Sequence, residues 1–202
     1  LQDGALVTGP AIDDLPRYSI REEDGAVFLG GCEAPGIPMP EGSDDHSILI
    51  IGAGAAASSC AETLRREGFA GGITMITGEQ YAPYDRPMLS KAVISGNAPA
   101  KAAQLRNPDF YQKLNIAVHT GDAVVDLDPG KKVVTTASGA THRGDMILLA
   151  TGSVPRALDL PGMDLSNVFT LRSRDDAAEI AASADGAKRA VVIGANFIGM
   201  EV

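Results

Sequence analysis

A short apolar strand followed at once by a glycine turn is the feature that most constrains this chain. Residues 48–51 are an uninterrupted run of Ile and Leu, which is typical of a strand buried on both faces of a sheet. The turn GAGAAA at residues 52–57 follows, and the alanine-rich segment 55–67 predicts a helix. Residues 73–77 read as a second strand. The segment 47–77 therefore predicts one strand–helix–strand unit with parallel strands.

The small residues of this turn suit a phosphate ligand. Gly52 permits the tight turn, Gly54 lets the backbone approach a pyrophosphate, and Ala57 lets helix and strand pack closely. Ala56, beside Ala57, is a further candidate cofactor-binding residue. The free N–H groups and the positive end of the helix dipole would hold the phosphate charge. Glu79, just past the second strand, can hydrogen-bond a ribose hydroxyl. We therefore predict dinucleotide binding; the alternative is a glycine-rich packing turn in an unrelated α/β protein.

A second, imperfect copy of this pattern lies near the end of the chain. Residues 190–193 repeat the buried-strand composition, and a turn with glycines at 194 and 199 follows. Asn196 stands where the middle glycine is usual, so either the backbone shifts or the amide hydrogen-bonds the pyrophosphate. The candidate binding residues here are Gly194, Asn196, Ile198 and Gly199. The alternative is that this turn only packs.

The rest of the chain adds β structure and a linker. An Asp24-Gly25 turn between two short apolar runs predicts a hairpin near the N-terminus. Residues 32–46 have a linker composition rich in Pro and Gly. Three segments, 116–126, 131–137 and 142–149, read as a β-meander. The expected fold class is α/β: a Rossmann-like domain of a βαβ unit plus a meander, with a short N-terminal β tail and the start of a second Rossmann domain.

Composition excludes several classes of protein. The chain carries 17 basic and 26 acidic residues, a formal net charge of −9, which argues against nucleic-acid binding. Apolar runs are too short for a membrane span. Two cysteines and three histidines, far apart in sequence, predict neither a disulfide framework nor a metal site. We expect no nucleic-acid partner, no membrane association and a cytoplasmic protein.

Four motifs in order carry a family resemblance. They are the turn at residues 52–57, the loop YDRPMLSK at 84–91, the Ala-Thr-Gly end at 150–152, and the segment IGANFIGME at 193–201. Together they resemble the FAD-dependent pyridine nucleotide-disulfide oxidoreductases of the ferredoxin-reductase type, in particular apoptosis-inducing-factor-like members with an N-terminal Rieske domain. The chain starts without Met and stops within a predicted helix, so we expect it to be a fragment.

This resemblance implies further site residues. Gly52, Gly54 and the residues around Ala57 would bind the pyrophosphate of FAD, with Glu79 on the ribose; the other implied FAD contacts are Arg86, Lys91, Val124, Thr151, Gly152 and Arg156. Lys91 would lie near the flavin ring, where a cation stabilises the anionic reduced flavin. Glu201 would pair with Lys91, and these two are the expected catalytic residues. A Lys91–Glu201 salt bridge is therefore predicted.

The resemblance also divides the chain. Residues 1–31 are similar to the C-terminal end of a Rieske domain, in particular Gly-Pro-Ala at 9–11 and Asp-Leu-Pro-Arg-Tyr at 14–18. Its [2Fe–2S] ligands would lie upstream of this chain. Residues 32–46 form the linker and residues 47–170 an incomplete FAD-binding domain. Residues 171–202 would begin an NAD(P)-binding domain.

The implied activity is an NAD(P)H oxidoreductase that passes electrons through FAD to a [2Fe–2S] centre. The acceptor would be an attached Rieske domain or a ferredoxin. Residues 86–96 contain no Cys, so a redox dithiol after the flavin loop is not expected. Two alternatives remain: a flavoprotein reductase with another acceptor, and a non-enzymatic NADH-sensing interaction protein.

Overall fold

A computed structural model describes residue 13 and residues 15–33, 36–107 and 109–202. The part of the predicted Rieske-like tail at residues 1–12 and 14 lies outside these ranges.

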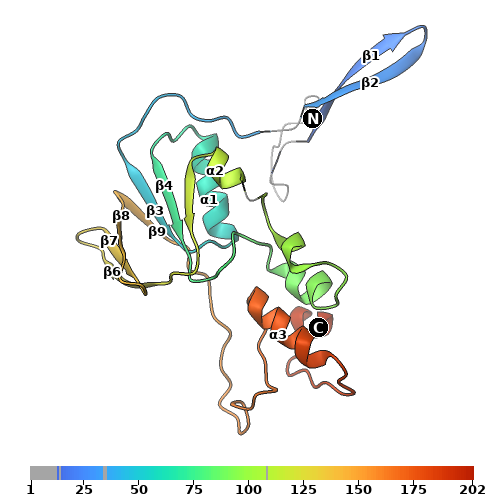
Figure 1. Cartoon of the computed structure of the whole chain (residues 1–202), viewed down its shortest axis with the longest axis vertical. Helices are drawn as coiled ribbons and strands as arrows, with labels where there is room; N and C mark the ends of the chain where they lie inside the picture. The colour runs from blue at the N-terminus through green and yellow to red at the C-terminus, as the bar shows by residue number, and fades with distance from the viewer. Residues whose placement is uncertain (1–12, 14, 34–35, 108) are drawn as a thin grey trace.

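The centre of the molecule is a four-stranded parallel sheet with the order β5-β4-β3-β9. Its strands are β3 (Ser47–Ile51), β4 (Gly72–Ile76), β5 (Ile116–His119) and β9 (Met146–Leu149). Helix α1 (Ala55–Arg66) connects β3 to β4 and completes the predicted strand–helix–strand unit (Figure 1). The expectation for residues 47–77 is therefore confirmed.

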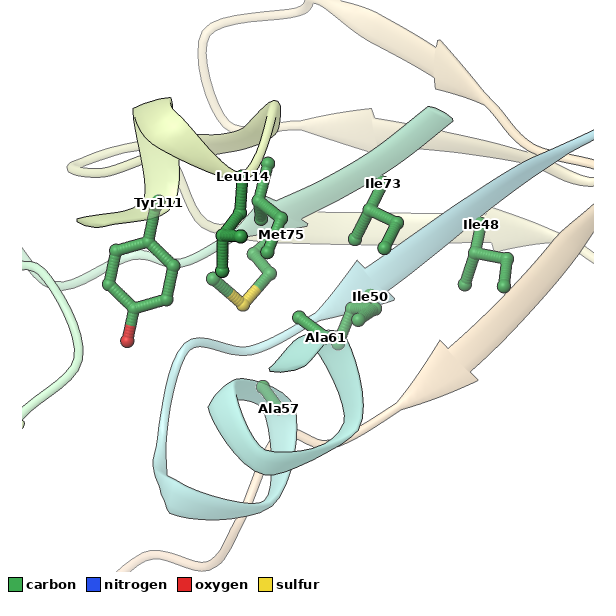
Figure 2. Close-up of a cluster of buried hydrophobic side chains, with 9 residues drawn as sticks. Ile48, Ile50, Ala57, Ala61, Ile73, Met75, Tyr111 and Leu114 are labelled. Atoms are coloured by element: carbon green, nitrogen blue, oxygen red, sulfur yellow. The ribbon is translucent and has the colours of Figure 1, made fainter. Parts of the chain in front are cut away.

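Strand β3 is buried on both faces because its side chains alternate between two cores. Ile48 and Ile50 face a cluster formed with α1 and the short helix α2 (Phe110–Lys113). Figure 2 shows this cluster, whose labelled members are Ile48, Ile50, Ala57, Ala61, Ile73, Met75, Tyr111 and Leu114. Leu49 and Ile51 pack on the other face with Ile76 and Val134. An apolar run without polar alternation thus fits a strand covered on both sides.

The predicted meander is present with narrower bounds. Strands β6 (Val124–Asp128), β7 (Val133–Thr136) and β8 (Thr141–Arg143) form an antiparallel sheet that covers the second face of β3. The expectation that residues 116–126 and 142–149 are single meander strands is wrong. Each is split between the two sheets, because their apolar outer parts pair with β4 and β3 as β5 and β9.

A glycine lies at each point where the chain passes from one sheet to the other, between β5 and β6 and between β8 and β9. Gly121 has φ +77°, a conformation that L-residues rarely adopt. At Gly144 a Cβ would lie 2.9 Å from the Leu49 Cβ, so the chain crosses close to the core there. A turn that needs glycine ends a strand even when the residues on either side favour β structure.

The C-terminal part holds two helices. Helix α3 (Arg174–Ala184) begins at a capping box between Ser173 and Asp176, and α4 (Phe197–Glu201) is a single turn. The strand expected at residues 190–193 is wrong: these residues are described and are not a strand, and Val191 is 89% exposed. A parallel strand forms only between neighbours, and no strand in the described ranges pairs with this segment.

The N-terminal hairpin is confirmed and extends away from the parallel sheet (Figure 1). Strands β1 (Arg17–Glu23) and β2 (Ala26–Glu33) form a sheet of their own. Asp24 and Gly25 connect them with φ values of 51° and 73°, as a type I′ turn requires. Between β4 and β5 lie the π-helix η1 (Leu89–Val93) and the 3₁₀ helix η2 (Ala100–Ala103). None of the described helices has the length and apolarity to cross a membrane.

Candidate cofactor site

The first glycine turn lies at the carboxyl edge of the parallel sheet, between the ends of β4 and β9. The Gly52 N–H donates to the Ile76 carbonyl at 2.7 Å, and the Ala150 N–H donates to the Ile51 carbonyl at 2.8 Å. Gly52 has φ +113°, and a Cβ there would overlap the Ala150 carbonyl oxygen. Only glycine fits this position. Ligands of open parallel sheets bind at this edge.

The N-terminus of α1 is open to a ligand. Gly54 is the N-cap residue in extended conformation, and no side chain within the described ranges caps the helix there. A Cβ on Gly54 would meet nothing within 4 Å, whereas Ala57 is fully buried against the sheet. Ala56 is exposed beside it. Free helix N–H groups next to open space suit the pyrophosphate of FAD, so the residues present fit that cofactor.

Glu79 and Arg86, predicted as separate FAD contacts, pair with each other. The Arg86 guanidinium forms an ion pair with the Glu79 carboxylate, and the Tyr84 hydroxyl donates to the same carboxylate. Arg86 Nη1 also donates to the Tyr84 hydroxyl at 2.9 Å and to the Arg172 carbonyl at 2.7 Å. Burial, followed by the bond to Glu79, raises the pKa of the Tyr84 hydroxyl. These contacts tie the loop after β4 to the residue before the Ser173 cap of α3.

Arg172 is a further candidate site residue, which the sequence did not indicate. Its Nη2 lies 3.2 Å from where a Cβ on Gly152 would be, so the guanidinium lies over the glycine that follows β9. Thr151 and Gly152 are exposed at this edge, as is Arg156 further along the connection. The only signal in the sequence was a base directly before the Ser173 cap of α3. Arg172 adds positive charge at the edge where the phosphates are expected.

Val124 opens β6 beside the same edge. Its half-buried side chain packs with the core that contains Leu49 and Ile51.

The second glycine turn has the backbone of the first. Gly194 has φ +110°, and the N-cap residue Asn196 has φ −82° and ψ −178°, against −80° and −171° at Gly54. The two alternatives for Asn196 were a shifted backbone and an amide bond to the pyrophosphate, and its dihedral angles show no shift from those of Gly54. Its Oδ1 instead accepts the Gly199 N–H at 3.0 Å and caps α4. At Gly199 a Cβ would overlap the Gly194 carbonyl oxygen, and Ile198 is half exposed.

The predicted Lys91–Glu201 salt bridge is confirmed. Lys91 Nζ in η1 lies 3.8 Å from Glu201 Oε1 in α4. The Ser90 hydroxyl donates to the other carboxylate oxygen of Glu201 at 2.6 Å. The loop after the first βαβ unit and the helix after the second glycine turn, far apart in sequence, therefore meet here. Within the described residues, no three His, Cys, Asp or Glu side chains gather as a metal site would require.

Comparison with known proteins identifies relatives of this chain. The profile of the pyridine nucleotide-disulphide oxidoreductase family matches residues 46–202. Apoptosis-inducing factor 3 of Homo sapiens is 35% identical over 100% of this chain and 35% of its own length. The ferredoxin–NAD(+) reductase subunit of the benzene 1,2-dioxygenase system of Pseudomonas putida is 41% identical over 78% of this chain and 38% of its own length.

A solved structure agrees with the fold. A ferredoxin reductase from Rhodopseudomonas palustris superimposes with a TM-score of 0.73 at 34% identity, covering 78% of this chain and 39% of that one. The chain thus spans little more than a third of the length of the relatives it matches.

Proposed function

Because the chain belongs to the pyridine nucleotide-disulphide oxidoreductase family, we propose that it supplies the flavin-binding part of an FAD-dependent NAD(P)H reductase. The observation that carries this proposal is the Lys91–Glu201 contact. It joins the helix that follows the second glycine turn to the loop that follows the first βαβ unit. A flavoenzyme reduced by a nicotinamide must bind two dinucleotides, and two such turns brought to one contact would supply both sites. Two relatives of this chain are ferredoxin reductases, which supports the proposed reductase function.

The first turn is proposed to hold FAD. Gly52, Gly54, Ala56 and Ala57 would bind its pyrophosphate at the open end of α1. The remaining proposed contacts are Glu79, Arg86, Lys91, Val124, Thr151, Gly152 and Arg156, to which the position of Arg172 adds one more. When bound, FAD supplies the ability to take two electrons from a nicotinamide and release them singly.

Lys91 and Glu201 are the proposed catalytic residues. An ammonium beside the flavin ring favours negative charge on that ring. Glu201, from the helix after the second turn, pairs with Lys91, so the Lys91 ammonium has a defined position when the two turns come together. Gly194, Asn196, Ile198 and Gly199 would hold NAD(P)H through their backbone groups, once the Asn196 amide releases the Gly199 N–H.

The electron acceptor is proposed to be a [2Fe–2S] centre in a ferredoxin or an attached Rieske domain. The match to apoptosis-inducing factor 3 extends over the whole chain, whereas the match to the Pseudomonas putida reductase covers 78% of it. This difference, with the family match over residues 46–202, supports a separate N-terminal segment. The full proposed division is a Rieske-like tail at 1–31, a linker at 32–46, an FAD-binding domain at 47–170 and an NAD(P)-binding start at 171–202. A cytoplasmic location is part of the same proposal.

The test is NADH-driven reduction of a [2Fe–2S] ferredoxin by the full-length protein. We expect bound flavin in the purified protein and steady turnover. Lys91→Ala should lower kcat at least about tenfold, while Lys113→Ala, an exposed lysine of α2 paired only with Asp109 among the described contacts, should leave it unchanged. Absence of flavin, or equal turnover in both variants, would refute the proposal. Slow NADH oxidation without an acceptor would favour a sensing protein instead.

A further inference from the structure

Ser90 is a buried hydroxyl that contacts the proposed catalytic pair. Only 5% of its surface is exposed, and its Oγ lies 2.6 Å from Glu201 Oε2. The other oxygen of the same carboxylate, Oε1, is the one that faces Lys91. The two oxygens of Glu201 are therefore divided between two neighbouring residues of η1.

The two contacts differ in their ability to fix the carboxylate. The Lys91–Glu201 separation of 3.8 Å exceeds hydrogen-bond length, and the Lys91 side chain is 58% exposed. The attraction in such a pair does not fix the orientation of the Glu201 carboxylate. A short hydrogen bond from a hydroxyl to a carboxylate is strong and directional. The next acceptor, the Pro87 carbonyl, is 3.4 Å from Ser90 Oγ, so the single hydroxyl proton goes to Glu201.

Ser90 and Lys91 are adjacent residues of the π-helix η1. In η1 the Ile94 N–H donates to the Leu89 carbonyl at 3.1 Å, which widens the turn. Leu89 is 1% exposed and packs with Tyr84 and Ala103, so this turn is anchored in a core.

We propose that Ser90 is a positioning residue: it holds Glu201 so that Oε1 faces Lys91, and thereby sets the second glycine turn against the flavin loop. The hydrogen bond, rather than the ion pair, supplies the orientation. This inference rests on the proposed function for its consequence in catalysis, while the contact itself can be tested without flavin.

The contact is tested by zero-length cross-linking of the full-length protein with a carbodiimide, which joins a carboxylate to an amine in contact. Mass spectrometry would quantify the Lys91–Glu201 amide in wild type, Ser90→Ala and Ser90→Thr. The Lys131–Asp128 pair, 2.9 Å apart and remote from η1, is the internal reference. We expect Ser90→Ala to lower the relative yield about tenfold and Ser90→Thr to restore it. Equal yields in all three proteins would overturn the proposal.

The catalytic consequence is tested by the rate of flavin reduction at saturating NADH. Ser90→Ala should retain its flavin but be reduced several-fold more slowly, with Ser90→Thr near wild type. A lowered cross-link yield with an unchanged rate would overturn the catalytic part of the proposal. If wild-type flavin is not reduced by NADH while the yield still depends on Ser90, the proposed function fails and the contact stands.

Discussion

The two glycine turns have nearly the same backbone and very different surroundings. Gly52 and Gly194 share a φ near +110°, and the N-cap residues Gly54 and Asn196 share an extended conformation. The first turn follows a buried strand and opens a helix of 12 residues. The second follows an exposed, unpaired segment and opens a helix of 5 residues. The turn is thus set by its own residues, whereas the strand before it depends on neighbours.

The turns also differ at the position that would meet a phosphate. Gly54 leaves the first N–H groups of α1 open, while the Asn196 side chain occupies the Gly199 N–H. One turn is therefore ready for an anion, and the other must give up an internal hydrogen bond before it can bind one.

The largest expected effect is that of a methyl group at the first glycine. Gly52→Ala places a Cβ against the Ala150 carbonyl at a strained φ, so we expect a loss of about 3 kcal/mol or more in unfolding free energy and loss of flavin. Gly194→Ala is the matched control, since it has the same φ but nothing within 4 Å of a Cβ, and should cost about 1 kcal/mol. Urea unfolding of the full-length variants measures both. Equal losses would mean that the contact with Ala150 is unimportant.

Alkaline pH should lower the unfolding free energy of the parallel-sheet domain, whose core contains Tyr111. Burial raises the pKa of this phenol to about 12 from its usual 10.0. Below pH 10 both states are protonated; between pH 10 and 12 only the unfolded chain ionises, so stability falls by about 2 kcal/mol over that range. Tyr84, whose pKa is also raised, contributes in the same direction.

Tyr111→Phe isolates the contribution of Tyr111. It removes the hydroxyl that bonds Ser58 at 2.7 Å, so it should be less stable at neutral pH but lose less between pH 10 and 12. Denaturant unfolding at several pH values measures this difference. Parallel pH curves for the two proteins would contradict the burial argument.

A side chain at the open position of the first turn should weaken FAD binding without changing the stability of the fold. Gly54→Asn copies the residue of the second turn into a space with nothing within 4 Å of a Cβ. We expect normal unfolding but flavin affinity at least about tenfold weaker, because the amide would cap α1 and occupy the phosphate position. Titration of FAD into flavin-stripped protein measures this; unchanged affinity would place the pyrophosphate elsewhere.

The reverse change should have the smallest effect. Asn196→Gly removes the cap of α4, which costs a few tenths of a kcal/mol, and frees the Gly199 N–H. We expect the Kd for NADH to fall about two- to threefold, with flavin content unchanged. A weaker binding of NADH would mean that the Asn196 amide itself holds the coenzyme.

Local patterns predicted what depends on local residues. The βαβ unit and the hairpin at Asp24-Gly25 were predicted in this way. The Lys91–Glu201 pair joins remote segments and was predicted only through the family resemblance. The split of residues 116–126 and 142–149 was not, because pairing with β4 and β3 depends on distant strands. The missing strand at 190–193 has the same cause.

Buried polar contacts were the other part that sequence could not predict. Arg65 is 1% exposed and donates to the carbonyls of Leu114, Phe69, Gly71 and Asn115, and its burial lowers its pKa. In sequence it is one more base at the end of an amphipathic helix. The ion pairs of Arg106 with Glu62 and Asp13 likewise join three remote segments. No spacing rule relates such residues.

The most direct test of the central claim is anaerobic addition of NADH to the full-length protein, followed by visible absorption and EPR spectroscopy. We predict that the flavin absorption bleaches and that a Rieske-type iron–sulfur signal appears. Bleaching without that signal would keep the reductase and exclude the Rieske acceptor. A protein that holds no flavin, or whose flavin NADH leaves oxidised, would contradict the account.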